Sequence, residues 1–342
     1  MKRSAILIGA AIVALLAAAP AQARPAFGVV NQGVLGETDF QRMETGGVQT
    51  LRFIIRWEAV EPEPGEYDWS RVDAIVAGAQ AHGIRLLPFV YGSPTWISDH
   101  ENHAPLDNAA ERSAWQGFLA ALASRYGPGG TFFAGGPEWP IRRWQIWNEP
   151  NFAVYWESPQ SPAAYAELVK LSASALRGVD PNAKVVLAGV AAVHDGVPWA
   201  GFLHELLETP GVRRSFDFVG FHPYSETLHD LRSQLDRIRR VMAHAGQPHA
   251  RLAITEIGWA SDGERPRPLV VGPTMQAELL RESFALMSRP RTGWRISDVQ
   301  WYAWQDSQAV EELCVFCEYA GLFDANGDPK PAWTAFQRAV SG

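Results

Sequence analysis

The sequence is poor in cysteine, has no excess of basic residues and has no second long apolar run after the one at its N-terminus. Its 342 residues include 30 Lys and Arg against 37 Asp and Glu, a formal net charge of −7. No basic stripe is therefore present to neutralise phosphates, and we expect no nucleic-acid partner. Hydrophobic residues make up 47% of the chain, which excludes a disordered protein and is typical of a globular one.

The only two cysteines, Cys314 and Cys317, have a C-x-x-C spacing. In an exported protein we expect them to form a local disulfide that closes one loop. A redox motif would need a strand followed by a helix N-terminus, and a zinc site would need further ligands at matching spacing. The sequence around the pair provides neither, so the disulfide is the favoured interpretation.

The first residues have the pattern of a secretory signal peptide. Two basic residues precede an apolar run over 5–19, and the sequence AQA that ends at Ala23 provides the small residues of a cleavage site. The run is shorter than the roughly 18 to 20 residues that a bilayer-spanning helix needs. We therefore expect a signal peptide over 1–23, cleavage without stable membrane insertion, and one secreted (extracellular or periplasmic) domain over 24–342.

The rest of the chain repeats one unit, in which a short apolar run is followed by a polar turn and an amphipathic stretch. Continuous apolar runs of this length suit parallel strands that are buried on both faces. The predicted strands are Phe27–Asn31, Thr50–Ile55, Arg85–Val90, Arg143–Trp147, Lys184–Ala188, Phe216–Phe221, Arg251–Thr255 and Val299–Ala303. The clearest predicted helices are Pro162–Arg177, Leu228–Ala245 and Met275–Met287.

Eight such strand–helix units predict an α/β protein that folds as a single-domain (β/α)8 TIM barrel. A doubly wound open sheet is the alternative, and it would place a glycine-rich dinucleotide turn after the first strand. The sequence GVVNQG at 28–33 does not match such a turn. In a barrel, chemistry is located at the carboxyl ends of the strands, so the residues that end each strand are informative.

Glu149 and Glu256 end the fourth and seventh predicted strands, which lie nearly across the mouth of a barrel from each other. Asn148 precedes Glu149, and strand side chains alternate between faces, so both can reach the mouth only if the strand has ended. Pro150 indicates that it has. We therefore expect the Asn148-Glu149 segment to be a loop that aims both side chains at one site.

Two carboxylates at one mouth are what glycosidic cleavage needs, because the leaving oxygen is protonated while the sugar carbon is attacked from the opposite face. A carboxyl separation of about 5 to 5.5 Å gives retention and one of about 6.5 to 9.5 Å gives inversion. The sequence does not give this distance, so both retention and inversion remain open. Arg52, His222 and Tyr224 would keep Glu256 ionised, and repulsion by that charge would keep Glu149 protonated.

The segment WQIWNEPN at 144–151 resembles the strand-four signature of clan A glycoside hydrolases, a retaining (β/α)8 superfamily, and the chain is most similar to families 39 and 5. Supporting matches occur along the whole of 24–342 and include LRF at 51–53, GSPTW at 92–96, GFHPY at 220–224 and TEIGW at 255–259. NEP alone would be weak, but NEP, HPY and TEIGW in this order and at barrel spacing are specific.

The resemblance implies a role for each matching residue. Glu149 would be the acid/base and Glu256 the nucleophile of a double displacement on a β-linked oligo- or polysaccharide. Arg52 and Tyr224 would steady the nucleophile, and Asn148 would bind the 2-hydroxyl of the sugar. A non-proline cis peptide often follows the last strand's tryptophan in this family, which would place it at Trp304–Gln305.

Fourteen Trp and eight Tyr are more than a core needs, and such rings serve as stacking platforms for sugars. By the resemblance, the ring of Trp304 would stack beneath the reacting sugar. Trp96 and Trp259 follow the third and seventh strands and are further candidates for substrate contact, as is His222.

We expect no cofactor and no metal, because carboxylates supply both the proton transfer and the nucleophilic attack. The acidic segment at 324–328 is too short for an EF-hand, and its Asn326-Gly327 pair predicts a tight turn. We also expect a monomer.

The alternative function is a non-catalytic carbohydrate-binding protein on a barrel scaffold, which would keep the aromatic platforms but replace one glutamate. A barrel enzyme for phosphorylated metabolites would need a glycine-rich phosphate loop, and GWAS at 258–261 fits one poorly.

Overall fold

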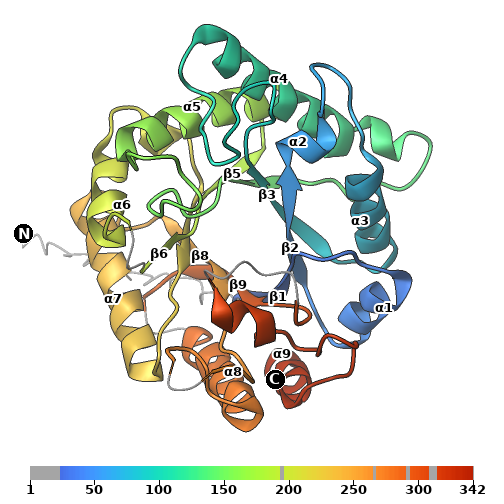
Figure 1. Cartoon of the computed structure of the whole chain (residues 1–342), viewed down its shortest axis with the longest axis vertical. Coiled ribbons are helices and arrows are strands. Elements are labelled where there is room, and N and C mark those ends of the chain that lie inside the picture. Colours follow the sequence, from blue (N-terminus) through green and yellow to red (C-terminus); the bar gives the residue numbers. More distant parts are fainter. Residues whose placement is uncertain (1–23, 193–195, 265–266, 290–292, 308–313, 342) are drawn as a thin grey trace, which may run out of the picture.

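The predicted signal peptide over 1–23 lies outside the described residues, which in this computed structural model are 24–192, 196–264, 267–289, 293–307 and 314–341. No helix within these ranges is long and apolar enough to cross a membrane. A ring of strands forms the centre of the molecule, and the helices surround it (Figure 1).

All strand pairings in the ring are parallel, and the order β5-β4-β3-β2-β1-β9-β8-β7-β6 is closed by pairing of β5 with β7. The strands are β1 (Ala26–Asn31), β2 (Thr50–Arg56), β3 (Arg85–Tyr91), β4 (Arg143–Ile146), β5 (Lys184–Leu187), β6 (Val190–Ala191), β7 (Phe218–His222), β8 (Arg251–Ile257) and β9 (Ile296–Tyr302).

The short strand β6, which the sequence did not predict, is the continuation of β5. Both pair with β7, with Val186 opposite Phe218 and Val190 opposite Phe221, so the two segments form one barrel strand interrupted at 188–189. The chain is therefore an eight-stranded TIM barrel, as predicted. Each of the eight predicted strands is present, with ends within three residues of those expected.

The helices lie outside the ring (Figure 1). They are α1 (Glu37–Thr45), α2 (Trp57–Val60), α3 (Ser70–Ala81), α4 (Ala109–Tyr126), α5 (Pro162–Val179), α6 (Trp199–Glu208), α7 (Leu228–His244), α8 (Pro273–Met287) and α9 (Pro331–Ser341), with short 3-10 turns η1 (Thr131–Phe133), η2 (Val212–Arg214) and η4 (Val315–Tyr319). The three helices predicted most clearly are present within two residues of the expected ends.

Local sequence explains where α5 begins. The Oγ atom of Ser161 accepts a hydrogen bond from the backbone N–H of Ala164 at 3.2 Å, and Pro162 occupies the first turn, where its missing N–H costs nothing. Seven residues of α5 are buried, at the spacing of one helix face, and this face packs on the barrel.

The inside of the barrel is filled by side chains. Leu87, Val186, Phe218 and Ala253 form one apolar cluster, although β3 is not a neighbour of β7 or β8 in the sheet, so these residues can meet only in the interior. The guanidinium of Arg52 is completely buried. A barrel filled in this way holds the strand ends rigidly and offers its carboxyl end as the place for a site.

The large number of tryptophans reflects the core and not a series of sugar platforms. Eight of the fourteen are fully buried: Trp57, Trp115, Trp144, Trp147, Trp259, Trp294, Trp301 and Trp304. Trp115 packs edge to face on both Trp57 and Trp147, an arrangement that buries large apolar area.

Two glycines allow the interrupted strand to approach β7 closely. A Cβ atom on Gly189 would lie 2.1 Å from Nε2 of His222, and a Cβ atom on Gly220 would lie 2.2 Å from the carbonyl oxygen of Leu187. Neither contact is possible for a real side chain, so the buried position of His222 depends on glycine at 189.

We predict that Gly189→Ala lowers the free energy of unfolding by about 1 to 3 kcal/mol, because the added methyl group overpacks a fully buried imidazole. Gly117→Ala in the middle of α4 is the control. Its Cβ meets nothing within 4 Å, and we expect it to stabilise the protein by about 0.5 to 1 kcal/mol. Urea denaturation measures both, and equal stability of the two variants would contradict the proposed close approach.

Candidate active site

The fourth strand ends early enough to aim two consecutive side chains at the barrel mouth. Strand β4 ends at Ile146, and Trp147 and Glu149 then adopt positive φ values of 70° and 35°. Such values are uncommon outside glycine and indicate a strained loop that the surrounding structure holds in place. The backbone N–H of Phe152 donates to the carbonyl of Glu149 at 2.9 Å, which closes a turn around Pro150. The expected loop over Asn148 and Glu149 is therefore present.

Arg52 on β2 connects three parts of the site. Its Nε donates to Oε1 of Gln145 at 2.7 Å, one terminal nitrogen donates to Oε1 of Glu256 at 2.5 Å, and the other donates to Oδ1 of Asn148 at 2.9 Å. The guanidinium carbon lies 4.1 Å from the ring centroid of Phe89. Arg52 is thus fixed on both its edge and its face, and it fixes the carboxylate and the amide beside it.

Glu256, near the end of β8, is held in its ionised form. Its second oxygen, Oε2, accepts a hydrogen bond from the hydroxyl of Tyr224 at 2.7 Å. Burial alone would raise the pKa of Glu256, but the charges of His222 and Arg52 and the hydrogen bonds from Tyr224 and Arg52 outweigh it and lower the pKa below its ordinary value.

Glu149 has the opposite character. Burial raises its pKa above the ordinary value, the nearby charge of Glu256 adds to the rise, and the bond to His222 opposes it without cancelling it. Sequence reasoning named the charge of Glu256 as the cause, whereas burial is the larger one. Nδ1 of His222 lies 2.7 Å from Oε1 of Glu149 and 3.6 Å from Oε2 of Glu256, so the histidine is chiefly the partner of Glu149.

The two carboxylates converge. One oxygen of Glu149, one oxygen of Glu256 and one ring nitrogen of His222 all lie within 4.8 Å of one another. The raised pKa of Glu149 favours its protonated form, and the lowered pKa of Glu256 favours its carboxylate form. The site can therefore offer a proton donor and an anionic nucleophile to the same small group of atoms.

These three residues could also be read as ligands of a cation. The donor set does not favour that reading, because Arg52 is completely buried and places its own positive charge on Oε1 of Glu256. The acidic segment at 324–328 is a turn, as expected: the carboxylate of Asp324 accepts hydrogen bonds from the backbone N–H groups of Asn326 and Asp328 at 2.8 and 2.9 Å.

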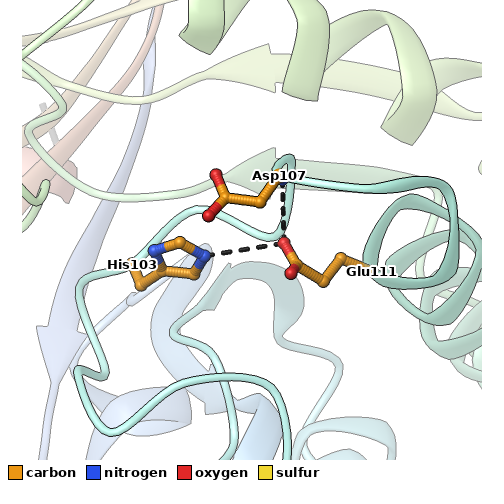
Figure 2. Close-up of side chains that lie close together, drawn as sticks. All are labelled: His103, Asp107 and Glu111. Atoms are coloured by element: carbon orange, nitrogen blue, oxygen red, sulfur yellow. Dashed lines mark hydrogen bonds and ion pairs between the residues drawn. The ribbon is translucent and has the colours of Figure 1, made fainter.

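Figure 2 shows a second group of titratable side chains, His103, Asp107 and Glu111, in the loop before α4 and in its first turn. Nδ1 of His103 lies 2.7 Å from Oε2 of Glu157, which follows β4, and its Nε2 lies 3.6 Å from Oε2 of Glu111. That oxygen already accepts the backbone N–H of Asp107 at 2.9 Å. The group ties the loop after β3 to the loop after β4, on the side of the mouth where Trp96 lies.

Two of the predicted sugar-stacking residues are core residues instead. Trp304 is 1% exposed, donates from Nε1 to Asp39 at 3.0 Å and packs between Phe323 and Trp333. Trp259 is fully buried, and its Nε1 donates to the carbonyl of Ser225 at 2.8 Å. Neither ring has a free face for a sugar. Trp96 differs, because its ring is partly exposed.

The non-proline cis peptide is at Tyr302–Ala303 and not at the expected Trp304–Gln305. Tyr302 ends β9, its ring lies 6.5 Å from that of Tyr224, and burial and the charges of Glu256 and Glu149 raise its pKa. Sequence reasoning missed Tyr302 and Gln145 as site residues. Tyr302 could have been found from its position at a strand end, but the resemblance to the family assigned the sugar contact at this strand to Trp304 instead.

Cys314 and Cys317 form a disulfide, and it lies beside the site. The pair brackets Phe316 in η4, whose partly exposed ring packs edge to face on Tyr224 with centroids 5.0 Å apart. Tyr224 is the residue that donates to Glu256. The disulfide-closed turn therefore packs, through Phe316, against the tyrosine that donates to this carboxylate.

Comparison with known proteins agrees with the resemblance noted from the sequence. The beta-galactosidase model of glycoside hydrolase family 42 matches residues 32–118. The chain is 26% identical over 298 residues to endo-1,4-beta-xylanase 5 of Pyricularia oryzae, an alignment that covers 82% of this chain and 66% of the relative. The chain thus spans slightly less than two thirds of the length of that relative.

Solved structures share the fold. A GH39 beta-xylosidase from Caulobacter crescentus superposes with a TM-score of 0.68 at 21% identity, covering 95% of this chain and 72% of that one. The GH39 enzyme from Xanthomonas axonopodis pv. citri gives 0.71 at 19% identity, with 95% and 67% covered. A GH5_18 from Bifidobacterium longum subsp. infantis gives 0.69 at 17% identity, with 93% and 79% covered. The likeness to families 39 and 5 is confirmed at the level of the fold.

We predict that Glu149→Gln becomes increasingly more stable than the unaltered protein as pH rises above the ordinary carboxyl pKa of about 4.3. Between that value and the raised native pKa, the folded protein binds more protons at Glu149 than the unfolded chain, so its stability falls with rising pH. Glutamine removes this loss. Urea denaturation between pH 4 and 8 measures the difference.

Glu256→Gln is the matched variant and should show the opposite trend. The lowered native pKa of Glu256 gives stability that is present above the ordinary carboxyl pKa and is lost as pH falls through the native value. At neutral pH the substitution leaves Arg52 buried without a counter-charge, and we expect a loss of about 3 kcal/mol or more. The same pH trend in both variants would show that the two carboxylates are not differentiated.

Proposed function

We propose that this chain is a clan A glycoside hydrolase that cleaves a β-linked glycosidic bond by double displacement with retention of configuration. The sequence matches and the shared fold support this proposal. The observation that carries the proposal is the pairing of Glu149 with Glu256. Their nearest oxygens lie within 4.8 Å, and their pKa values are shifted in opposite directions. We infer from this close approach the short carboxyl separation of retaining enzymes, about 5 to 5.5 Å, in which one carboxylate attacks the sugar directly.

In the first step, the protonated carboxyl of Glu149 donates its proton to the glycosidic oxygen while the Glu256 carboxylate attacks the anomeric carbon. The hydrogen bonds from Arg52 and Tyr224 keep Glu256 ionised and hold its two oxygens in a fixed direction before substrate binds. This preorganisation removes the need to reorient the nucleophile during the reaction.

In the second step, Glu256 is an ester and no longer carries a negative charge, so part of the effect that raised the pKa of Glu149 is lost. Glu149 is then a better base and takes a proton from the water that attacks the glycosyl ester. His222, which contacts both carboxylates, is placed to stabilise whichever one is ionised. Asn148, with its oxygen turned to Arg52, is placed to donate from its amide nitrogen to a sugar hydroxyl.

We propose an oligo- or polysaccharide as the substrate, and β-1,4-xylan and xylo-oligosaccharides are the first to test. The support is that the matched relatives are named as a β-1,4-xylanase and a β-xylosidase. The signal-peptide pattern over 1–23 supports secretion as the route to such a substrate. Trp96, whose ring is partly exposed, is the aromatic residue that we propose for contact with the sugar, in place of Trp304 and Trp259.

We predict that the first product formed from an aryl β-xyloside or a xylo-oligosaccharide is the β-anomer. Double displacement inverts the anomeric carbon twice, so the initial product keeps the configuration of the substrate. Proton NMR within the first minutes of hydrolysis, before mutarotation, distinguishes the anomers. An α-anomer formed first would exclude Glu256 as a covalent nucleophile.

We predict that Glu149→Gln lowers kcat/KM by about 10² to 10⁴-fold on a xylo-oligosaccharide and far less on an aryl glycoside with a good leaving group. Such a leaving group departs without protonation, so only the slow second step remains impaired. Glu256→Gln should abolish turnover of both substrates, and Glu205→Gln, exposed on α6, should leave both unchanged. Equal losses of Glu149→Gln on the two substrates would contradict the acid role.

A further inference from the structure

A cavity of about 450 Å³ opens at the amino ends of the strands and is lined by Arg24, Arg85, Arg143, Phe218, Arg251 and Asp298, among others. Since all strands of the barrel are parallel, their amino ends lie at the end of the barrel opposite the mouth that holds Glu149 and Glu256. We call this cavity the floor pocket. It is separate from the site described above.

The charges that line the floor pocket do not balance. Arg143 donates two hydrogen bonds to Asp298, at 2.6 and 2.7 Å, which neutralises the only carboxylate of the lining. Arg24, Arg85 and Arg251 have no carboxylate partner in the part of the chain that the structure describes. Three positive charges are thus uncompensated at one place on a chain whose formal net charge is −7.

The order of the sequence places these cations together. Arg85, Arg143 and Arg251 are the first residues of β3, β4 and β8, and a parallel barrel brings the first residue of every strand to the same end. Lys184 begins β5 in the same way, but it pairs with Asp217 at 3.1 Å and adds no free charge.

The arginines are also partly preorganised. The guanidinium carbons of Arg143 and Arg251 lie 4.2 and 5.2 Å from the ring centroid of Phe218, which is itself buried. Stacking on one ring restrains both guanidinium groups while their N–H donors stay available at the edges. The Nε of Arg143 is buried without a hydrogen-bond partner among the described residues.

We propose that the floor pocket binds a small organic anion of about the size of a sugar that carries phosphoryl or several carboxylate groups. Guanidinium groups bind such groups through paired hydrogen bonds, and a pocket of this volume is in the range that holds small molecules and exceeds the size of a lone ion. The same groups could be presented by a free metabolite or by an anionic polysaccharide chain. The proposal does not depend on the hydrolytic function.

The test is isothermal titration calorimetry of the full chain with glucose 6-phosphate, citrate and oligogalacturonate, and with glucose as the neutral probe. We expect saturable binding of at least one anion and none of glucose. Tighter binding of glucose 6-phosphate or citrate would identify a free small anion as the ligand, and tighter binding of oligogalacturonate would identify a polymer. No saturable binding of any anion, or equal binding of glucose, would overturn the proposal.

Arg85→Ala and Arg251→Ala should each weaken anion binding about tenfold or more, since each removes charge-assisted hydrogen bonds. The control is Arg281→Ala, which removes the same charge from the exposed surface of α8, where Arg281 lies beside Glu282. Thermal unfolding of each variant verifies that it is folded. Unchanged affinity in the two pocket variants, or an equal loss in Arg281→Ala, would show that binding is not in the floor pocket.

Discussion

The buried guanidinium of Arg52 is the constraint on which the rest of the site depends. A cation without access to water is tolerated in a protein only when it is paired and its donors are satisfied. Arg52 meets this requirement with one carboxylate and two amide oxygens, from Glu256, Asn148 and Gln145. The cost of burying the charge therefore compels Glu256 to remain ionised, and it fixes the position of the amide that precedes Glu149.

The difference between the two carboxylates follows from what each one contacts, because both are almost fully buried. Glu256 accepts from a permanent cation and from a phenol, whereas Glu149 has a histidine as its only side-chain partner among the described residues. Burial without a permanent counter-charge favours the protonated acid. The close approach of Gly189 to His222 contributes indirectly, since it lets the imidazole lie deep enough to reach both acids.

Most of the scaffold was predictable because a buried parallel strand leaves a clear pattern, a short continuous apolar run between turns. The residues that surround the carboxylates were predictable for a related reason: Asn148, His222 and Tyr224 are polar groups at strand ends of a barrel, and Arg52 is a charged residue within an apolar strand. What could not be predicted was which aromatic rings are covered. Trp304 and Trp259 are buried by residues remote in sequence, such as Asp39 and Ser225. A tryptophan in a core and a tryptophan at a binding site look the same in the sequence.

The same limit explains β6 and the role of Tyr302. The break in the fifth strand depends on packing of Gly189 against β7, and the environment of Tyr302 depends on Tyr224 and Gln32, from other strand ends. These are tertiary contacts that no local pattern records. The pKa of Glu149 is a further case, since its main cause is the depth of the side chain and not the neighbouring charge that the sequence could suggest.

The turn that carries Phe316 has a mechanical consequence. The disulfide closes a four-residue loop around Phe316, and so short a loop restricts how far the ring can move. Its partner, Tyr224, which donates to Glu256, therefore packs against a ring whose position is restricted. Reduction of the Cys314–Cys317 disulfide would let Phe316 move away from Tyr224, although no residue of the barrel strands is changed.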